Sequence, residues 1–368
     1  MSSPFLSKDL DSSTYTVHAP REALPLNLPP VVSVPKQINV ETRGIYHGLP
    51  IYGKEFHGKS ALIAGANGIS GAYMLRVMRD YPDIWKRVYC ISRRPQMNDV
   101  PAWFSSHAID LFNNDPRGVA KDIEKARIKD IDYAFFYAFM PVAASDSRTL
   151  FKEAEELAEI NGKIFDNFLE GLYLAGLRPK RILLQTGCKG YGQHYGPMIC
   201  PLIEDSVQTA RNYKEPNFYY SQEDVLWKFC KRTGIEWVES RPSFIVGLVK
   251  DNNLNFLSPL MLYAAVSKYQ GKKELVFPGD RRGWDKLVDL STAYHFGLTT
   301  SPPPADDEGQ YTTIEMQQDS EVGYPYKANI KYRFLLSDWC QDKQNRADWE
   351  HMGQKFGLDL TLMNQSYM

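Results

Sequence analysis

The sequence SALIAGANGISG occupies residues 60–71 and joins a short apolar run to three glycines, Gly65, Gly68 and Gly71. The apolar run predicts a buried strand, and residues 68–81 carry apolar side chains at helical spacing. Glycines let a backbone approach a phosphate closely, and a helix N-terminus offers it free N–H groups. The spacing is G-x-x-G-x-x-G, so a glycine-rich turn without a ligand is the alternative. We expect a dinucleotide site because the flanking strand and helix are the context that the motif requires.

The chain beyond this motif alternates between predicted strands and predicted helices. Apolar runs predict strands at 87–94, 105–112, 132–139, 181–187 and 236–247. Helical spacing predicts helices at 115–130, 147–176, 219–234, 254–274 and 348–358. This alternation indicates an α/β fold with a Rossmann-like, doubly wound parallel sheet. The continuous apolar strands agree, because a parallel sheet is covered on both faces.

The 368 residues divide by composition into three parts. Residues 1–55 are rich in proline, which removes backbone donors, and predict an extended N-terminal arm. Residues 56–300 carry the predicted Rossmann domain with its substrate-side helices. Residues 301–368 become polar and irregular and predict a small C-terminal cap on the substrate side.

Charge and composition narrow the classes of protein. The formal net charge of -1 argues against a nucleic-acid binder, which normally carries an excess of positive charge. We find neither an apolar run of the length that a membrane span needs nor the pattern of a signal peptide. The five cysteines are scattered, so they predict reduced thiols, no metal site and a cytoplasmic protein. Whether the chain forms a homodimer stays open.

Ser92, Arg93 and Arg94 follow the second predicted strand. In dinucleotide-binding folds an acidic residue in this region holds the ribose of NAD, whereas arginine accommodates the 2′-phosphate of NADP. No carboxylate lies here, so the two guanidinium groups favour NADPH, with two solvated arginines as the alternative. Asp110, after the third strand, would hydrogen-bond adenine; a turn or helix-cap aspartate explains it equally well.

The usual proton-donor pair of this fold, a tyrosine four residues before a lysine, is missing from the expected helix. In residues 217–224, NFYYSQED, the fourth residue after each tyrosine is acidic. An acid there would raise a phenol pKa rather than lower it. A lysine can arrive from another element: Lys189 follows the fifth strand, at the edge where open α/β sheets bind ligands.

Several motifs together resemble a known family. GANGISG, SRRP, FFYAF, LQTGCKGYG, PNFYYSQEDVL and RPSFIVG, with LYAAVSKYQGK at 262–272 and FPGDRRGWD at 277–285, are similar to atypical short-chain dehydrogenases. The family is typified by progesterone 5β-reductase and iridoid synthase, and GIYHGLP at 44–50 is similar to its fungal members. The resemblance runs from about residue 58 to 295 and implies a Rossmann fold.

The resemblance implies roles for individual residues. The family's catalytic lysine and tyrosine match Lys189 and Tyr219. Its contacts to the phosphates match Asn67, Gly68 and Ile69, and those to the 2′-phosphate match Arg93 and Arg94. Its contacts to adenine match Asp110 and Leu111, and those beside the nicotinamide match Gln185 and Ile245. Residues 252–254 match a further contact stretch. A packed aromatic at a helix start is the alternative for Tyr219.

The activity that the resemblance implies is the 1,4-reduction of an enone or enal by NADPH, or the reduction of a related carbonyl. The substrate would be a small hydrophobic secondary metabolite of terpenoid, steroid-like or polyketide type. A redox-neutral cyclase or isomerase and a non-catalytic NADP(H)-binding sensor are the alternatives, because fold alone does not define function.

The chain departs from the family pattern at three places. Gly190 replaces a histidine, and Phe139 with Met140 replaces a threonine–tryptophan pair, which predicts a more apolar substrate site. The C-terminal third diverges after about residue 300, and its cap is expected to be short for the family. Aromatic residues are expected around the substrate: Phe136, Tyr137, Phe139, Tyr219 and Tyr220.

Overall fold

The computed structural model describes residues 40–43, 46–50, 52–94, 101–142, 154–192, 216–249, 257–278, 290–300 and 336–358, together with residues 360 and 363. The chain divides into two units, residues 1–39 and 40–368, and every described residue belongs to the second. The proline-rich part of the predicted arm, the contact stretch 252–254 and most of 277–285 therefore lie outside the described residues.

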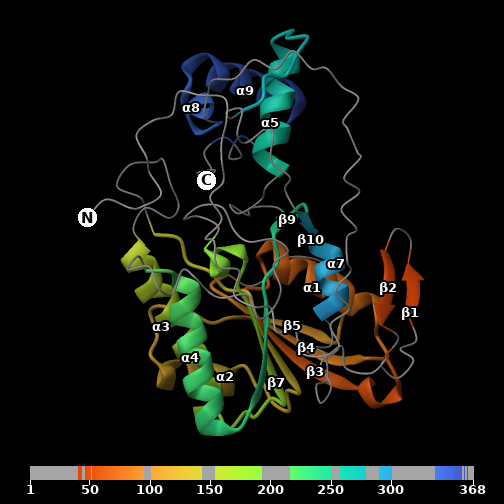
Figure 1. Ribbon diagram of the computed structural model, residues 1–368, viewed down its shortest axis with the longest axis vertical. Helices are drawn as coiled ribbons and strands as arrows, with labels where there is room; N and C mark the ends of the chain where they lie inside the picture. Colours follow the sequence, from red (N-terminus) through yellow and green to blue (C-terminus); the bar gives the residue numbers. More distant parts are fainter. Residues whose placement is uncertain are drawn as a thin grey trace, which may run out of the picture. The chain divides into compact units, whose positions relative to one another are not determined.

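The largest sheet of the described residues is parallel (Figure 1). Within the described residues it has six strands in the order β5-β4-β3-β6-β7-β8. The strands are β3 (Lys59–Ala64), β4 (Trp85–Ser92), β5 (Phe104–Ala108), β6 (Tyr133–Phe136), β7 (Arg181–Gln185) and β8 (Glu236–Ser240). The order reverses between β3 and β6, as in doubly wound dinucleotide-binding folds, so the Rossmann-like prediction is confirmed.

Helices cover both faces of this sheet, as the apolar strands predicted. Ala61 and Ile63 of β3 pack against Met74 of α1 (Ile69–Asp80). The intervening Leu62 packs into the opposite core, with Phe165 and other residues of the helices on that side. Those helices are α2 (Pro116–Lys125), α3 (Ala154–Leu174) and α4 (Phe218–Thr233).

The prediction of one strand over residues 236–247 was wrong. The chain leaves the main sheet after β8, and β9 (Phe244–Val246) pairs in parallel with β10 (Leu290–Thr292) in a separate two-stranded sheet. Pro242 lies in the break, and proline has no N–H with which to continue a ladder. The break matters because Arg241, beside it, faces the candidate site.

A short hairpin precedes the Rossmann unit. Strands β1 (Val40–Arg43) and β2 (Tyr46–Pro50) pair antiparallel, and a 3₁₀ turn, η1 (Lys54–Phe56), follows. Leu49 of β2 packs with Val77 of α1 and Leu298 of α7 (Ala293–Thr300). The last part of the predicted arm is therefore an ordered hairpin against α1 and α7.

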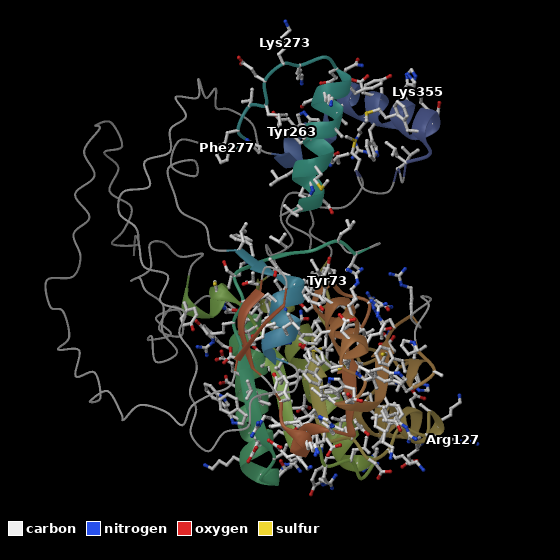
Figure 2. All side chains as sticks on the ribbon, turned by 90° about the vertical axis from the view of Figure 1, so that its right-hand side faces the viewer. Tyr73, Arg127, Tyr263, Lys273, Phe277 and Lys355 are labelled. Atoms are coloured by element: carbon white, nitrogen blue, oxygen red, sulfur yellow. The ribbon has the colours of Figure 1, made fainter. Side chains whose placement is uncertain are left out.

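Three helices share a smaller core. They are α5 (Leu257–Tyr269), α8 (Leu336–Gln341) and α9 (Lys343–Phe356). Tyr263 of α5, labelled in Figure 2, meets Trp339 of α8 edge to face at 5.2 Å between ring centroids. Gln270, just after α5, donates to Asn345 and Asp348 of α9. No helix among the described residues has the length and apolar character to cross a membrane.

Candidate active site

The glycine loop is built for close backbone packing. Gly65 follows β3 with a φ of +82°, and a Cβ built on it would lie 2.6 Å from the backbone nitrogen of Ala138, just after β6. A Cβ on Gly71 would collide with the carbonyl oxygen of Gly65, whereas one on Gly68 would have only that oxygen nearby, at 3.4 Å. Two of the three glycines are thus required by the fold, and Gly68 leaves space beside the loop.

The N-terminus of α1 suits an anion. Gly68 is the N-cap residue, no side chain caps the helix, and the first turn holds no acidic residue. The first N–H groups of a helix have no partner within it, and they carry the positive end of the helix dipole. With the glycine loop, this end fits the pyrophosphate of a dinucleotide, and Ile69 begins the helix there.

Asn67 joins the glycine loop to the end of β4. Its side-chain amide donates to Ser92 Oγ at 3.1 Å and to the carbonyl oxygen of Arg94 at 2.8 Å. Ser92 Oγ also lies against the carbonyl oxygen of Arg94. Arg93 and Arg94 are both exposed, so their guanidinium groups are accessible on a turn that Asn67 fixes.

Asp110 has the turn role that the sequence left open. Its carboxylate accepts hydrogen bonds from the backbone N–H groups of Phe112 and Asn113 at 2.8 and 2.9 Å. Partial burial alone would raise the pKa of Asp110. The hydrogen bonds from Asn113 and Phe112 and the charge of Arg93 outweigh this effect and hold the pKa below its ordinary value. Leu111 points into the core beneath α2 and α3, and its carbonyl oxygen accepts from Asn167.

Lys189 lies on a short turn that α4 holds in place. The turn is the 3₁₀ segment η2 (Cys188–Tyr191), directly after β7. Asn217 Nδ2 donates to the carbonyl oxygen of Lys189 at 2.9 Å, and the Tyr220 hydroxyl donates to that of Gly190 at 2.5 Å. Asn217 also caps α4 through Tyr219 N, so one asparagine orients both the lysine turn and the tyrosine helix.

The Tyr219 hydroxyl lies at the end of β7. A Cβ built on Gly187 would be 3.0 Å from Tyr219 Oη, so the phenol rests against the backbone two residues before Lys189. Burial, followed by the nearness of Cys188 and Glu239, raises the pKa of Tyr219 above its ordinary value. The phenol is a protonated hydrogen-bond donor at neutral pH.

Burial lowers the pKa of Lys189 to about 8. A lysine with this pKa changes charge just above neutrality, within the range that general acid–base catalysis uses. The turn therefore presents an ammonium group at neutral pH that deprotonates in mildly alkaline solution.

Other predicted residues occupy the same edge of the sheet or its neighbourhood. Gln185 ends β7, and its buried Oε1 has no hydrogen-bond partner among the described residues, so it could accept a hydrogen bond from a donor placed beside it. Ile245 lies on β9. Phe139 packs on Phe218, which packs on Tyr219, with centroids 5.3 and 4.3 Å apart.

The aromatic residues expected around the substrate do not all lie together. Phe139 and Tyr219 share a small apolar cluster at the start of α4. Phe136, expected near the substrate, instead packs in the main core against Phe165, because β6 points it toward α3. Met140 follows Phe139, and its backbone is bound at both N–H and carbonyl by the side chain of Asn161.

A charged cluster around Arg241 was not predicted from the sequence. The sequence did hold a signal, because Glu239 and Arg241 lie within a stretch predicted to be a strand, and charges buried in a strand require partners. It also missed Asn217, although asparagine before a predicted helix is a typical N-cap. Within the described ranges, no group of three or more His, Cys, Asp or Glu residues could hold a metal ion.

Comparison with known proteins identifies a family. A family model described as a PRISE-like Rossmann-fold domain matches residues 61–309. An uncharacterised protein of Schizosaccharomyces pombe is 31% identical over 236 residues, which cover 64% of this chain and 55% of that protein. The (S)-8-oxocitronellyl enol synthase of Catharanthus roseus is 28% identical over 240 residues, covering 63% and 57%. The matches confirm the resemblance seen in the motifs.

A third relative has a different activity. The 3-oxo-Delta(4,5)-steroid 5-beta-reductase of Arabidopsis thaliana is 29% identical over 249 residues, covering 63% of this chain and 58% of the enzyme. The chain thus spans 55–58% of the lengths of these three relatives.

Proposed function

Because this chain belongs to the family of PRISE-like Rossmann-fold domains, we propose that it is an NADPH-dependent reductase of an activated C=C bond or a related carbonyl. The substrate is a hydrophobic secondary metabolite of terpenoid, steroid-like or polyketide type. The observation that carries the proposal is the position of the Tyr219 hydroxyl against Gly187, two residues before Lys189, at the carboxyl edge of the sheet. The names of the enol synthase and steroid reductase relatives support it.

The residues present fit a dinucleotide. The uncapped N-terminus of α1 and the space beside Gly68 suit the pyrophosphate, and Arg93 and Arg94 suit a 2′-phosphate. The unpartnered Gln185 Oε1 suits the carboxamide of nicotinamide. When bound, NADPH supplies the hydride; the protein supplies position and electrostatics.

The residues of the protein then stabilise the negative charge that develops on the substrate. Reduction of an enone at its β-carbon develops charge on the carbonyl oxygen, and Tyr219 Oη donates a hydrogen bond to that oxygen. A raised phenol pKa keeps this donor protonated. The Lys189 ammonium orients the ribose and adds positive charge, and Phe139 with Phe218 contacts the apolar body of the substrate.

The cofactor preference rests on Arg94 and on the asparagine that fixes its turn. Replacing Arg94 with alanine should raise the Kd for NADPH by about 10- to 100-fold, because a hydrogen bond to a charged group is worth about 1.5–3 kcal/mol. The Kd for NADH should hardly change. Asn67→Ala should raise the Kd for NADPH by a smaller factor. Arg117 is exposed on α2, and its replacement by alanine should leave this Kd unchanged. Fluorescence titration of the unmodified protein and the three variants measures the Kd for each cofactor. Equal losses for both cofactors in Arg94→Ala would refute this preference.

The pH dependence rests on Lys189. The lysine is protonated below a pKa of about 8, so a rate that needs its ammonium is full at neutral pH and falls as the pH rises through about 8. Lys189→Arg keeps the charge at alkaline pH and should remove this fall. The measurement is kcat against pH for both proteins; an identical alkaline fall in both would assign it to another group.

The overall activity is tested by following NADPH absorbance with a panel of enones that includes 2-cyclohexenone. The reductase proposal expects NADPH oxidation that Tyr219→Phe and Lys189→Ala each impair. NADPH binding without turnover of any enone or ketone would contradict it and favour the sensor. Conversion of the substrate without net NADPH oxidation would favour the cyclase or isomerase.

A further inference from the structure

A buried ionic cluster lies beneath the turn that carries Lys189. Arg241, between β8 and β9, donates from Nε and Nη2 to the two carboxylate oxygens of Glu239 at 2.8 and 2.7 Å. The same Nη2 lies 3.4 Å from Glu223 Oε1 on α4. Thr186 Oγ1, just after β7, donates to Glu239 at 2.5 Å. The guanidinium thus connects Glu239 of β8 with Glu223 of α4, and Glu239 in turn binds Thr186 after β7.

The side chains of this cluster are removed from solvent. The exposed fraction is 0% for Glu223, 6% for Glu239 and 16% for Arg241. Two buried carboxylates would repel each other strongly, and each would be costly without a cation. Arg241 supplies that cation in the forked geometry that arginine alone offers.

The cluster faces both proposed catalytic residues. Glu223 lies one helical turn after Tyr219, so Arg241 holds the face of α4 that carries the tyrosine. The Arg241 guanidinium also lies 5.0 Å from the ring centroid of Tyr191, in the Lys189 turn. A Cβ built on Gly190 would be 3.8 Å from Arg241 Nε, so the guanidinium lies directly behind this turn.

We propose that Arg241 is a positioning residue that fixes the Tyr219 hydroxyl relative to the Lys189 turn by tying α4 to the ends of β7 and β8. This role rests on the proposed reductase function, in which both residues act on one substrate. In this role Arg241 acts through Glu223, Glu239 and Tyr191.

The test compares Arg241→Met and Arg241→Lys with a matched control, Arg181→Met. Arg181 is a buried arginine that pairs with Glu236 and joins the same strands, β7 and β8, at their opposite ends. For each protein we would measure Tm, the NADPH Kd, kcat and KM with 2-cyclohexenone, and hydrogen exchange in residues 188–191 and 217–223.

We expect Arg241→Met to lower kcat by about 100-fold, since a misplacement of about 1 Å can cost that much, with little change in KM or NADPH Kd. Arg241→Lys keeps the charge but loses the forked guanidinium, so relative to Arg241→Met it should restore Tm more fully than kcat. It can also be measured if the methionine variant does not fold. Exchange in both segments should accelerate in the Arg241 variants. Arg181→Met should lower Tm and leave kcat and this exchange unchanged.

Three results would overturn the positioning role. They are an equal loss of kcat in Arg181→Met, full recovery of kcat in Arg241→Lys, or unchanged exchange of both segments in Arg241→Met. If the unmodified protein reduces no enone, the proposed function fails, and the exchange measurement still decides whether Arg241 holds the two segments together.

Discussion

Replacing Tyr219 with phenylalanine should lower kcat for enone reduction by about 10²- to 10³-fold, the usual cost of removing one donor to a developing oxyanion. The substitution removes a single oxygen and keeps the ring that packs on Phe218. NADPH affinity should persist, because the phosphate loop and the β4 turn are untouched. Stopped-flow measurement of NADPH oxidation at saturating cofactor isolates the effect on the chemical step.

The matched control is Tyr263→Phe. Tyr263 is a buried tyrosine in the smaller helical core, and its hydroxyl donates to the carbonyl oxygen of Val276 at 2.8 Å. Its loss should cost about 1 kcal/mol of stability and leave kcat intact. If both variants lost kcat alike, the effect would be one of stability, and Tyr219 would be a packed aromatic at a helix start.

The fold could be predicted because its signals are local and periodic. The run after Lys59 is continuously apolar, as a strand covered on both faces must be, and its glycines fall where the chain turns into α1. The strand over 236–247 failed for a nonlocal reason. Whether an apolar run stays in one sheet depends on which strand it pairs with. Here β9 pairs with β10, which lies nearly fifty residues later in the chain.

The candidate site could be predicted in its parts and not in its assembly. Motif resemblance names Lys189 and Tyr219, but spacing does not show that Asn217 binds the Lys189 carbonyl and caps α4 at once. The sequence argument expected the acid four residues after the tyrosine, Glu223, to raise the phenol pKa. The pKa of Tyr219 is raised, but by burial first and then by Cys188 and by Glu239 of β8.

Asp110 and Asn67 show that the sequence does not decide whether a polar side chain serves a turn or a ligand. The sequence left Asp110 open between adenine and a turn, and the resemblance gave Asn67 to the cofactor. Both side chains bind groups of the protein itself: Asp110 in its own turn, and Asn67 on Ser92 and Arg94. Short polar side chains serve turns and ligands with the same atoms. Only the positions of the neighbouring N–H and C=O groups separate the two uses.

Replacing Gly65 with alanine should both destabilise the protein and weaken NADPH binding. A φ of +82° costs an L-residue about 1–2 kcal/mol, and the new Cβ would meet the Ala138 backbone at 2.6 Å. Overpacking of this kind adds about 1–3 kcal/mol. Relief of the clash must move the loop from the end of β6, and a tenfold rise in Kd needs only about 1.4 kcal/mol of lost binding energy.

Gly176→Ala separates the clash from the backbone strain. Gly176 has a φ of +76°, and a Cβ on it would meet nothing within 4 Å. Both variants therefore carry the strain of a positive φ, but only Gly65→Ala carries the collision. Urea unfolding should show the larger loss of stability for Gly65→Ala, and titration should show a rise in NADPH Kd for that variant alone. Equal losses of stability with unchanged Kd would mean that the loop accommodates a side chain, and the close packing of Gly65 on β6 would not shape the cofactor site.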